Sequence, residues 1–353
     1  MSQAEIVDRA VQAIGNGQPD DWIIEPARHA EELKERAPVL AMVLRTSRVQ
    51  APMQQYVRIN AEAIEAQRTY KRVITQANIA ILMTAILSAA LLATGLIAGK
   101  GEAGIALALL GLLSLLTGAL AAAWLTRVRA GRLLENWMRS RAMAEQARLA
   151  YFEAVVDSPV TNGSEIPLPL LKFEYFRRYQ FDVQMAFFNG RRHQHRKSAG
   201  TTVMLASLAA IPASFAAGAG GLIGGLADFR WLPLAAIGSI GAALTFFASM
   251  RENITGDTAT AERYAAVLSK LEALSGRLDD VRAAALAGDP PTIVQDFVKL
   301  VHDELSREQE AWLKNGETAR AGLTEQLDQA LKRKPDQNAP APQKVTAPVT
   351  GPQ

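Results

Sequence analysis

Four long runs without a charged residue dominate the pattern of hydrophobic and polar positions along the chain. They cover residues 77–98, 103–126, 201–226 and 231–250. A helix needs about 20 mostly apolar residues to cross the hydrocarbon core of a bilayer, and each run has that length. Buried core helices of a soluble protein have the same composition, but four runs of spanning length favour membrane helices.

Short polar segments divide the four runs into two pairs. Residues 99–102 separate the first two runs, and residues 228–230 separate the last two. Connections this short force consecutive helices to lie antiparallel, as a hairpin. The sequence therefore predicts an all-α membrane protein with four transmembrane helices arranged as two hairpins.

Long amphipathic helices are predicted outside the spans. Residues 53–77 contain neither Gly nor Pro, so we expect one continuous helix to enter the first span. After the second span, Trp137, Ala144 and Tyr151 recur every seven residues. A similar stripe after the fourth span comprises Tyr264, Leu268, Leu271, Leu278 and Val281. Such stripes are typical of coiled-coil seams, and we expect both to continue membrane helices into the cytoplasm.

These elements predict five segments along the chain. They are a soluble helical region at 1–52, a two-span unit at 53–157, a linker at 158–169, a second two-span unit with terminal cytoplasmic helices at 170–333, and a disordered tail at 334–353. Prolines mark the linker, while Pro, Ala, Gln and Thr dominate the tail. The order helix, span, span, helix thus occurs twice.

Basic residues flank the spans on one side of the membrane. They are Arg68, Lys71, Arg72, Arg127, Arg129, Arg132, Arg191, Arg192, Arg196, Lys197 and Arg251. The two hairpin tips hold only Lys100 and Arg230, each near an acid. Because Lys and Arg are enriched in cytoplasmic loops, both termini are expected in the cytoplasm, with the flanking residues at the membrane surface.

Small residues within the spans have the four-residue spacing of close helix packing. The glycine-rich run pairs Gly220 with Gly224 and Gly221 with Gly225; weaker pairs on other spans are Ser114 with Gly118 and Gly238 with Ala242. A phosphate-binding loop is rejected, because the run lacks the Gly-Lys-Ser/Thr ending and lies within an apolar span. Packing within one subunit and packing between subunits both remain open.

Polar side chains in the first span suggest either of two roles. Thr84 and Ser88 share a helix face, with Asn78 and Thr94 only loosely on it. They either line a polar path or bond to a neighbouring helix. The spans contain no Asp, Glu, Lys, Arg or His, which argues against an ion-coupled transporter.

Composition excludes several classes of chemistry. The chain has no cysteine and a net charge of only +3, so disulfides, thiolate sites and nucleic-acid binding are not expected. His193 and His195 fit a basic membrane-surface cluster better than a metal site, while His29 and His302 are expected in solvent. Acidic residues are also expected on solvated faces. With no catalytic set discernible, we expect neither an enzyme nor a cofactor or metal.

Three stretches carry a resemblance to a known family. They are 176–197 (FRRYQFDVQMAFFNGRRHQHRK), 297–314 (FVKLVHDELSREQEAWLK) and 137–151 (WMRSRAMAEQARLAY). Together with the two-span layout, they resemble the SLATT domains, the two-transmembrane effector domains associated with SMODS and SLOG proteins in bacterial conflict systems. The second half is the better match, and the likeness covers most of residues 53–320.

The resemblance implies an oligomeric effector that forms a pore in, or perturbs, the bacterial inner membrane. It also implies a nucleotide-sensing partner as the trigger. SLATT effectors work with a sensor domain, and none is fused in this sequence, so the trigger is expected to be a separate protein. The alternative is a passive anchor or scaffold in the bilayer, whose cytoplasmic helices recruit a soluble partner.

Overall fold

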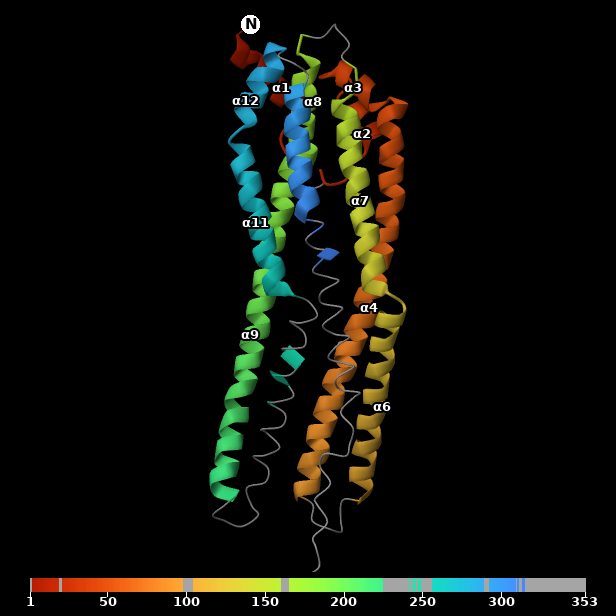
Figure 1. Ribbon diagram of the computed structural model, residues 1–353, viewed down its shortest axis with the longest axis vertical. Helices are drawn as coiled ribbons and strands as arrows, with labels where there is room; N and C mark the ends of the chain where they lie inside the picture. The colour runs from red at the N-terminus through yellow and green to blue at the C-terminus, as the bar shows by residue number, and fades with distance from the viewer. Residues whose placement is uncertain are drawn as a thin grey trace, which may run out of the picture. The chain divides into compact units, whose positions relative to one another are not determined.

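The computed structural model describes residues 2–18, 21–97, 104–159, 165–224, 256–288 and 292–308, with short stretches at 241, 244–245, 247–248, 310 and 313–314. Every regular element in these ranges is a helix (Figure 1). The all-α prediction is therefore confirmed for the described part. The chain divides into a unit of Met1–Leu313 and a unit of Lys314–Gln353, and the tail predicted at 334–353 lies outside the described residues.

Three short helices open the chain. Helix α1 (Gln3–Ile14) begins with a capping box, in which the Ser2 side chain accepts from Glu5 N while the Glu5 carboxylate accepts from Ser2 N. Helices α2 (Pro26–Glu32) and α3 (Pro38–Leu44) each begin with a proline. Proline suits the first helical position, since its missing N–H would have no partner there.

Helix α4 (Ser47–Ile97) is continuous over 51 residues. It begins five residues before Pro52, so the boundary predicted between residues 52 and 53 falls within it. At 1.5 Å per residue its length is roughly 75 Å, more than twice the thickness of a hydrocarbon core of about 30 Å. The expected continuity of the helix from residue 53 into the first apolar run is confirmed.

Helices α6 (Gly104–Ala130) and α7 (Leu133–Val156) follow one another with a break between them. Gly131 and Arg132 form a turn, and Arg132 has the left-handed φ of 48°. The helix expected after the second apolar run is present as α7, and this turn separates it from α6. Figure 1 shows α6 beside one part of α4 and α7 beside the other, in agreement with the contacts between these helices.

The second half of the chain begins with a helix that changes type. Helix α8 (Leu168–Phe176) passes into the π-helix η1 (Arg177–Asp182) and then into α9 (Val183–Gly224) without leaving helical geometry. The π-turn was not predicted. After residue 255 come α11 (Asp257–Ser275), α12 (Leu278–Ala287) and a helix at 292–308.

One hydrophobic core joins most of these elements. It receives buried side chains from α1, α2, α3, α7, α8, η1, α11, α12, helix 292–308 and the first residues of α4. Helix α8 is its centre, because eight of the nine α8 residues are buried. We call this assembly the helical core. Its residues come from the regions predicted as 1–52, 53–157 and 170–333, and Leu168 comes from the segment predicted as a linker, because the first two residues of α8 lie in that segment.

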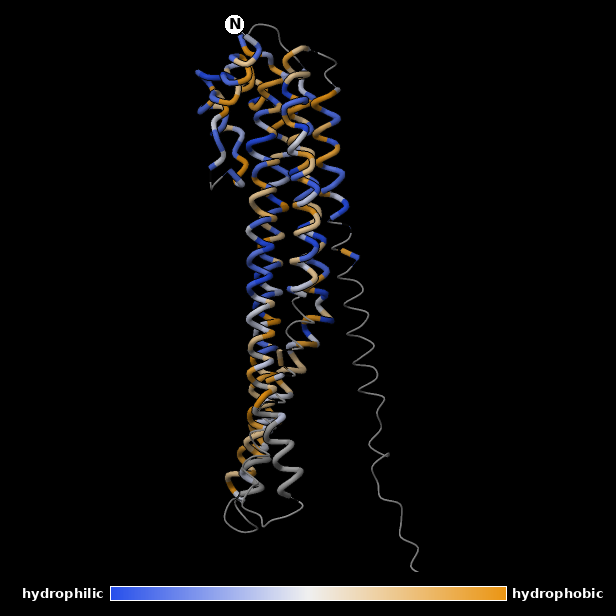
Figure 2. Tube along the Cα trace, turned by 90° about the vertical axis from the view of Figure 1, so that its left-hand side faces the viewer, coloured by the Kyte–Doolittle hydropathy of each residue, from blue (hydrophilic) through white to orange (hydrophobic). Residues whose placement is uncertain are grey.

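Two stretches of helix, and not four, meet the length and hydropathy required to cross a membrane among the described residues. They are Ser47–Leu91 in α4 and Gly104–Val156 in α6–α7. Figure 2 shows mixed hydrophilic and hydrophobic residues at the end with the N-terminus and mostly hydrophobic ones toward the far end of the described helices. The predicted third span is helical to Gly224, whereas residues 231–240 of the fourth lie outside the described ranges.

Candidate functional site

Residues 77–97 of α4 and helix α6 form an antiparallel pair, which we call the apolar helix pair. Thr84 Oγ1 lies 3.0 Å from Thr117 Oγ1, and Ser88 Oγ lies 2.8 Å from Ser114 Oγ. A Cβ atom added to Gly118 would lie 3.6 Å from Thr84 Cγ2, in ordinary van der Waals contact. Ser114 and Gly118 therefore pack against the first span. Thr84 and Ser88 bond to a neighbouring helix, the second of the two roles considered for them.

Asn78 and Thr94, the two other polar residues of the predicted path, make no side-chain hydrogen bond to the described residues of α6. Asn78 and Thr94 are half-buried in α4. A polar path along α4 remains a prediction. Three glycines of the glycine-rich run, Gly220, Gly221 and Gly224, belong to α9, but the structure does not describe their packing. The predicted packing residues Gly225, Gly238 and Ala242 lie outside the described residues.

The outer faces of the apolar helix pair are covered with exposed hydrophobic side chains. Ile105 is 80% exposed and Leu115 68% exposed on α6, while Ile79, Met83 and Ile86 are exposed on α4. Soluble monomers seldom leave so many large apolar side chains of neighbouring helices exposed to water. The surface is suited to contact with lipid tails or with other apolar helices.

Aromatic and basic side chains mark the end of this apolar surface. The Arg127 guanidinium lies 5.7 Å from the centre of the Trp124 ring, and Tyr70 stacks on Trp137 with 5.4 Å between ring centres. Tyrosine and tryptophan are enriched where a membrane helix leaves the hydrocarbon region. The basic residues predicted at the membrane surface are exposed on α4, α6 and the turn after α6, namely Arg68, Lys71, Arg72, Arg127, Arg129 and Arg132.

A second basic cluster lies on α9 ahead of its apolar part. Arg191, Arg196 and Lys197 are exposed, and Arg192 is half-buried. Arg191 lies over the Phe187 ring at 5.6 Å. Arg251 lies outside the described residues.

His195 and Ser198 of α9 both bond to the first residue of α11. The Asp257 carboxylate lies 2.6 Å from His195 Nδ1 through one oxygen and accepts from Ser198 Oγ at 2.6 Å through the other. Asp257 is buried, and the edge of Tyr264 packs against the His195 ring. Because serine and histidine both bond to the same carboxylate, the group joins α9 to α11.

The helical part of the structure buries acidic side chains that the sequence pattern had placed in solvent. Glu174 is fully buried and bonds to Arg177 and Arg282, each at 2.6 Å. Asp21 is buried and receives a two-pronged bond from Arg178 at 2.8 and 2.9 Å. The expectation that acidic residues occupy solvated faces was wrong at these positions, because arginines from η1 and α12 replace the lost water.

Two histidines are also buried instead of solvated. His29 Nδ1 lies 2.7 Å from the Tyr175 hydroxyl, which in turn lies 2.7 Å from the Tyr151 hydroxyl. His29 stacks on Tyr179, and His302 Nδ1 lies 3.0 Å from a Glu153 carboxylate oxygen. Burial raises the pKa of Tyr151 and Tyr175 well above the usual range and that of Tyr179 to about 12. These hydroxyls therefore remain neutral at physiological pH.

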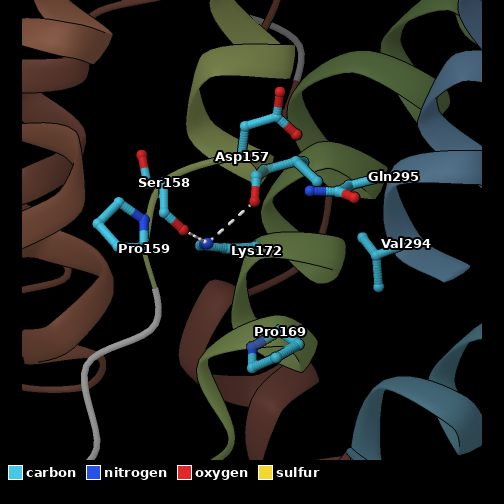
Figure 3. A pocket seen from close by; sticks show the side chains of 8 residues that line it. Asp157, Ser158, Pro159, Pro169, Lys172, Val294 and Gln295 are labelled. Carbon is cyan, nitrogen blue, oxygen red and sulfur yellow. Dashed lines mark hydrogen bonds between the residues drawn. The ribbon is translucent and has the colours of Figure 1, made fainter. Parts of the chain in front are cut away.

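A cavity of about 240 Å³ lies where α7 ends and α8 begins (Figure 3). Lys172 Nζ donates to the backbone oxygens of Val156, at 2.9 Å, and of Ser158. Burial lowers the pKa of this ammonium to about 8. Since Val156 is the last residue of α7 and Ser158 follows two residues later, the lysine caps the end of that helix and fixes it to α8.

The arrangement offers no metal centre within the described residues, where no group of three or more His, Asp or Glu side chains lies close enough to hold an ion. No protein-family model matches the chain, and no curated protein or solved structure is similar to it. The functional argument therefore depends on the chain's own geometry. The feature with the clearest functional character is the junction where helices of the core continue into apolar helices.

Proposed function

We propose that this protein is an oligomeric membrane effector whose apolar helices permeabilise a bacterial inner membrane when a separate sensor protein acts on the helical core. The proposal includes the second predicted hairpin, at 201–226 and 231–250, and cytoplasmic termini. It follows the resemblance to SLATT domains and the exposed apolar faces of α4 and α6.

The observation that supports it most is the continuity of α4. The first part of this helix packs in the helical core through Val49, Met53 and Tyr56, and its last part packs against α6. Helix α9 likewise runs unbroken from η1 to Gly224. A displacement in the core therefore moves the apolar helices with it, since no flexible segment interrupts either helix.

Oligomerisation is tested with single cysteines, because the natural chain has none. Leu115→Cys and Leu109→Cys place a thiol on the exposed apolar face of α6, whereas Ala121→Cys places it at a buried position on the same helix. We expect a bifunctional maleimide to yield dimers and larger species from the exposed positions in membranes, and monomers from Ala121→Cys. Monomers from every position, with and without a candidate sensor, would contradict the proposal.

Permeabilisation is tested with a voltage-sensitive dye in bacterial cells that overproduce the protein. We expect depolarisation, and we expect Gly221→Leu with Gly225→Leu to abolish it at an equal protein level if close packing of the glycine run builds the pore. An unchanged membrane potential in cells with the natural chain and a co-expressed candidate sensor would refute the effector function.

The size of the helical core favours a second function, a membrane anchor that recruits a soluble partner. Most described helices contribute to this core, which is far more structure than two apolar helices need for insertion. Under this alternative, changing Arg191, Arg192, Arg196 and Lys197 to neutral residues spoils localisation or docking, while the membrane potential never changes.

A further inference from the structure

The pairing of α4 with α6 brings two basic segments to one level. Thr84 lies beside Thr117 in this antiparallel pair. Twelve residues back from Thr84 along α4 is Arg72, and twelve residues forward from Thr117 along α6 is Arg129. Arg72 and Arg129 are therefore level with one another, although 57 positions separate them in the sequence.

Six basic side chains gather at this level. Three belong to α4 and three to the end of α6 and the turn after it, and all are exposed, namely Arg68, Lys71, Arg72, Arg127, Arg129 and Arg132. We call them the basic collar. The same register places Ala77 level with Trp124, so the collar begins where the apolar helix pair ends.

Most of the positive charge in the collar has no counter-charge. Arg68 lies 3.8 Å from Glu65, and Arg132 pairs with Glu135. Within the described ranges, no carboxylate lies within ion-pair distance of Lys71, Arg72, Arg127 or Arg129. Of these four, Arg72 on α4 and Arg127 and Arg129 on α6 offer planar donor groups, which bind phosphate oxygens in a two-pronged fashion.

We propose that the basic collar binds the phosphate groups of anionic phospholipids. The ligand class follows from two neighbouring surfaces: unneutralised cations attract phosphate, and the exposed apolar side chains Ile79 and Leu120, on the adjacent turns, suit acyl chains. A free anion would use only the first surface. The inference depends on the membrane placement in the proposed function, and it adds the lipid class that the helix pair selects.

The experiment uses the purified full-length protein in an uncharged detergent. Short-chain phosphatidylglycerol, short-chain phosphatidylcholine or inorganic phosphate is added, and the melting temperature is measured. A ligand that binds only the folded state raises the melting temperature with its concentration. We expect phosphatidylglycerol to raise it by several degrees and the other two to leave it nearly unchanged, since each basic residue near the surface adds to the attraction for anionic lipid.

The decisive variant replaces four residues, as Lys71→Gln, Arg72→Gln, Arg127→Gln and Arg129→Gln. We expect its apparent affinity for phosphatidylglycerol to fall by about tenfold or more. The matched control changes four exposed basic residues near the N-terminus, as Lys34→Gln, Arg36→Gln, Arg45→Gln and Arg48→Gln. Phosphatidylglycerol should raise the melting temperature of this control as much as that of the natural chain, because the control loses the same amount of charge at a distance from the collar.

Two results overturn the lipid site. One is that phosphatidylglycerol raises the melting temperature of the collar variant and of the control equally. The other is that phosphatidylcholine or phosphate raises the melting temperature of the natural chain as much as phosphatidylglycerol does. Flotation with vesicles of pure phosphatidylcholine separates this failure from failure of the membrane placement. A chain that floats but does not prefer anionic lipid refutes only the collar, whereas a chain that does not float refutes the placement itself.

Discussion

Arg148 connects three parts of the helical core through a single buried side chain. Its guanidinium donates to Gln180 Oε1 at 2.7 Å, to Tyr179 O at 3.1 Å and to Trp22 O at 3.3 Å. The three acceptors belong to η1 and to the segment between α1 and α2. An arginine can serve three acceptors in this way because its donors form a rigid planar fork.

We expect Arg148→Met to destabilise the protein by about 2–4 kcal/mol, because it leaves buried acceptors without a donor. Urea unfolding of the full chain in detergent measures the change. Arg139→Met is the matched control on α7, since Arg139 is exposed and pairs with Glu135 on the same helix. Its effect on the free energy of unfolding should stay below about 0.5 kcal/mol. Equal losses in the two variants would contradict the role assigned to Arg148.

The buried tyrosines predict a loss of stability in base. Tyrosine in the unfolded chain ionises near pH 10, whereas burial raises the pKa of Tyr179 to about 12 and those of Tyr151 and Tyr175 well above the usual range. Between these values the folded chain binds more protons than the unfolded chain, so the free energy of unfolding falls as pH rises. The contribution is fully present below pH 10.

Between pH 10 and 12 the free energy of unfolding should fall by about 1.4 kcal/mol per pH unit for each buried tyrosine. Urea unfolding over this range measures it. In Tyr179→Phe, the free energy of unfolding should fall less steeply with pH, by about 1.4 kcal/mol per pH unit. Its free energy of unfolding at pH 8 should be close to that of the natural chain. A slope equal to that of the natural chain would refute the assignment.

Individual buried polar residues could not be predicted from local sequence. Glu174 is paired with Arg282, 108 positions away, and His29 is bonded to Tyr175, 146 positions away. Near each residue the sequence is rich in charges, which is also the pattern of a solvated helix face. Only the tertiary contacts of η1 and α8 distinguish the two cases.

At the level of elements, helices were predictable because their periodicity is a property of neighbouring residues. The apolar stripes of α11 and helix 292–308 form part of the core, where Leu268, Leu271, Phe297 and Val301 are buried. The break between α6 and α7 has a local signal in Gly131, yet the left-handed conformation of Arg132 has none. A Cβ atom at Gly131 would lie 2.7 Å from Arg127 O, so this turn requires glycine.

Two glycines of α6 test the packing of the apolar helix pair. Gly118 faces Thr84, whereas a Cβ atom at Gly111 would meet nothing within 4 Å. We expect Gly118→Leu to lower the melting temperature in detergent by several degrees, because overpacking costs about 1–3 kcal/mol. Gly111→Leu should leave it unchanged. Equal effects would show that α6 does not meet α4 through Gly118.

At the level of the whole molecule, the core unites helices from both halves of the chain. Buried side chains of α7 and of α8 belong to one cluster with those of α11 and helix 292–308. The repeated order helix, span, span, helix predicted two separate units. It could not predict the shared core, because the order of elements along the sequence does not reveal which helix faces pack together. Shared burial makes each half depend on the other.

Division of the chain within residues 160–164 tests this dependence. We expect the fragment of residues 1–159 alone to be rapidly cleaved by protease, since Tyr151, Phe152 and Val155 lose the surface that buries them. Co-expression with residues 165–353 should restore protection and yield a complex that copurifies. A fragment 1–159 that resists protease alone would refute the shared core.

The two connections between the helical core and the apolar helix pair have unequal stiffness. Helix α4 is one rod, whereas α6 reaches α7 through the turn at Gly131 and Arg132. Twisting or tilting the core therefore forces α4 to follow, while α6 can pivot at its joint and keep its own inclination. A movement of the core therefore displaces α4 relative to α6, and the hydroxyl pairs Thr84–Thr117 and Ser88–Ser114 are the contacts that such a displacement exchanges.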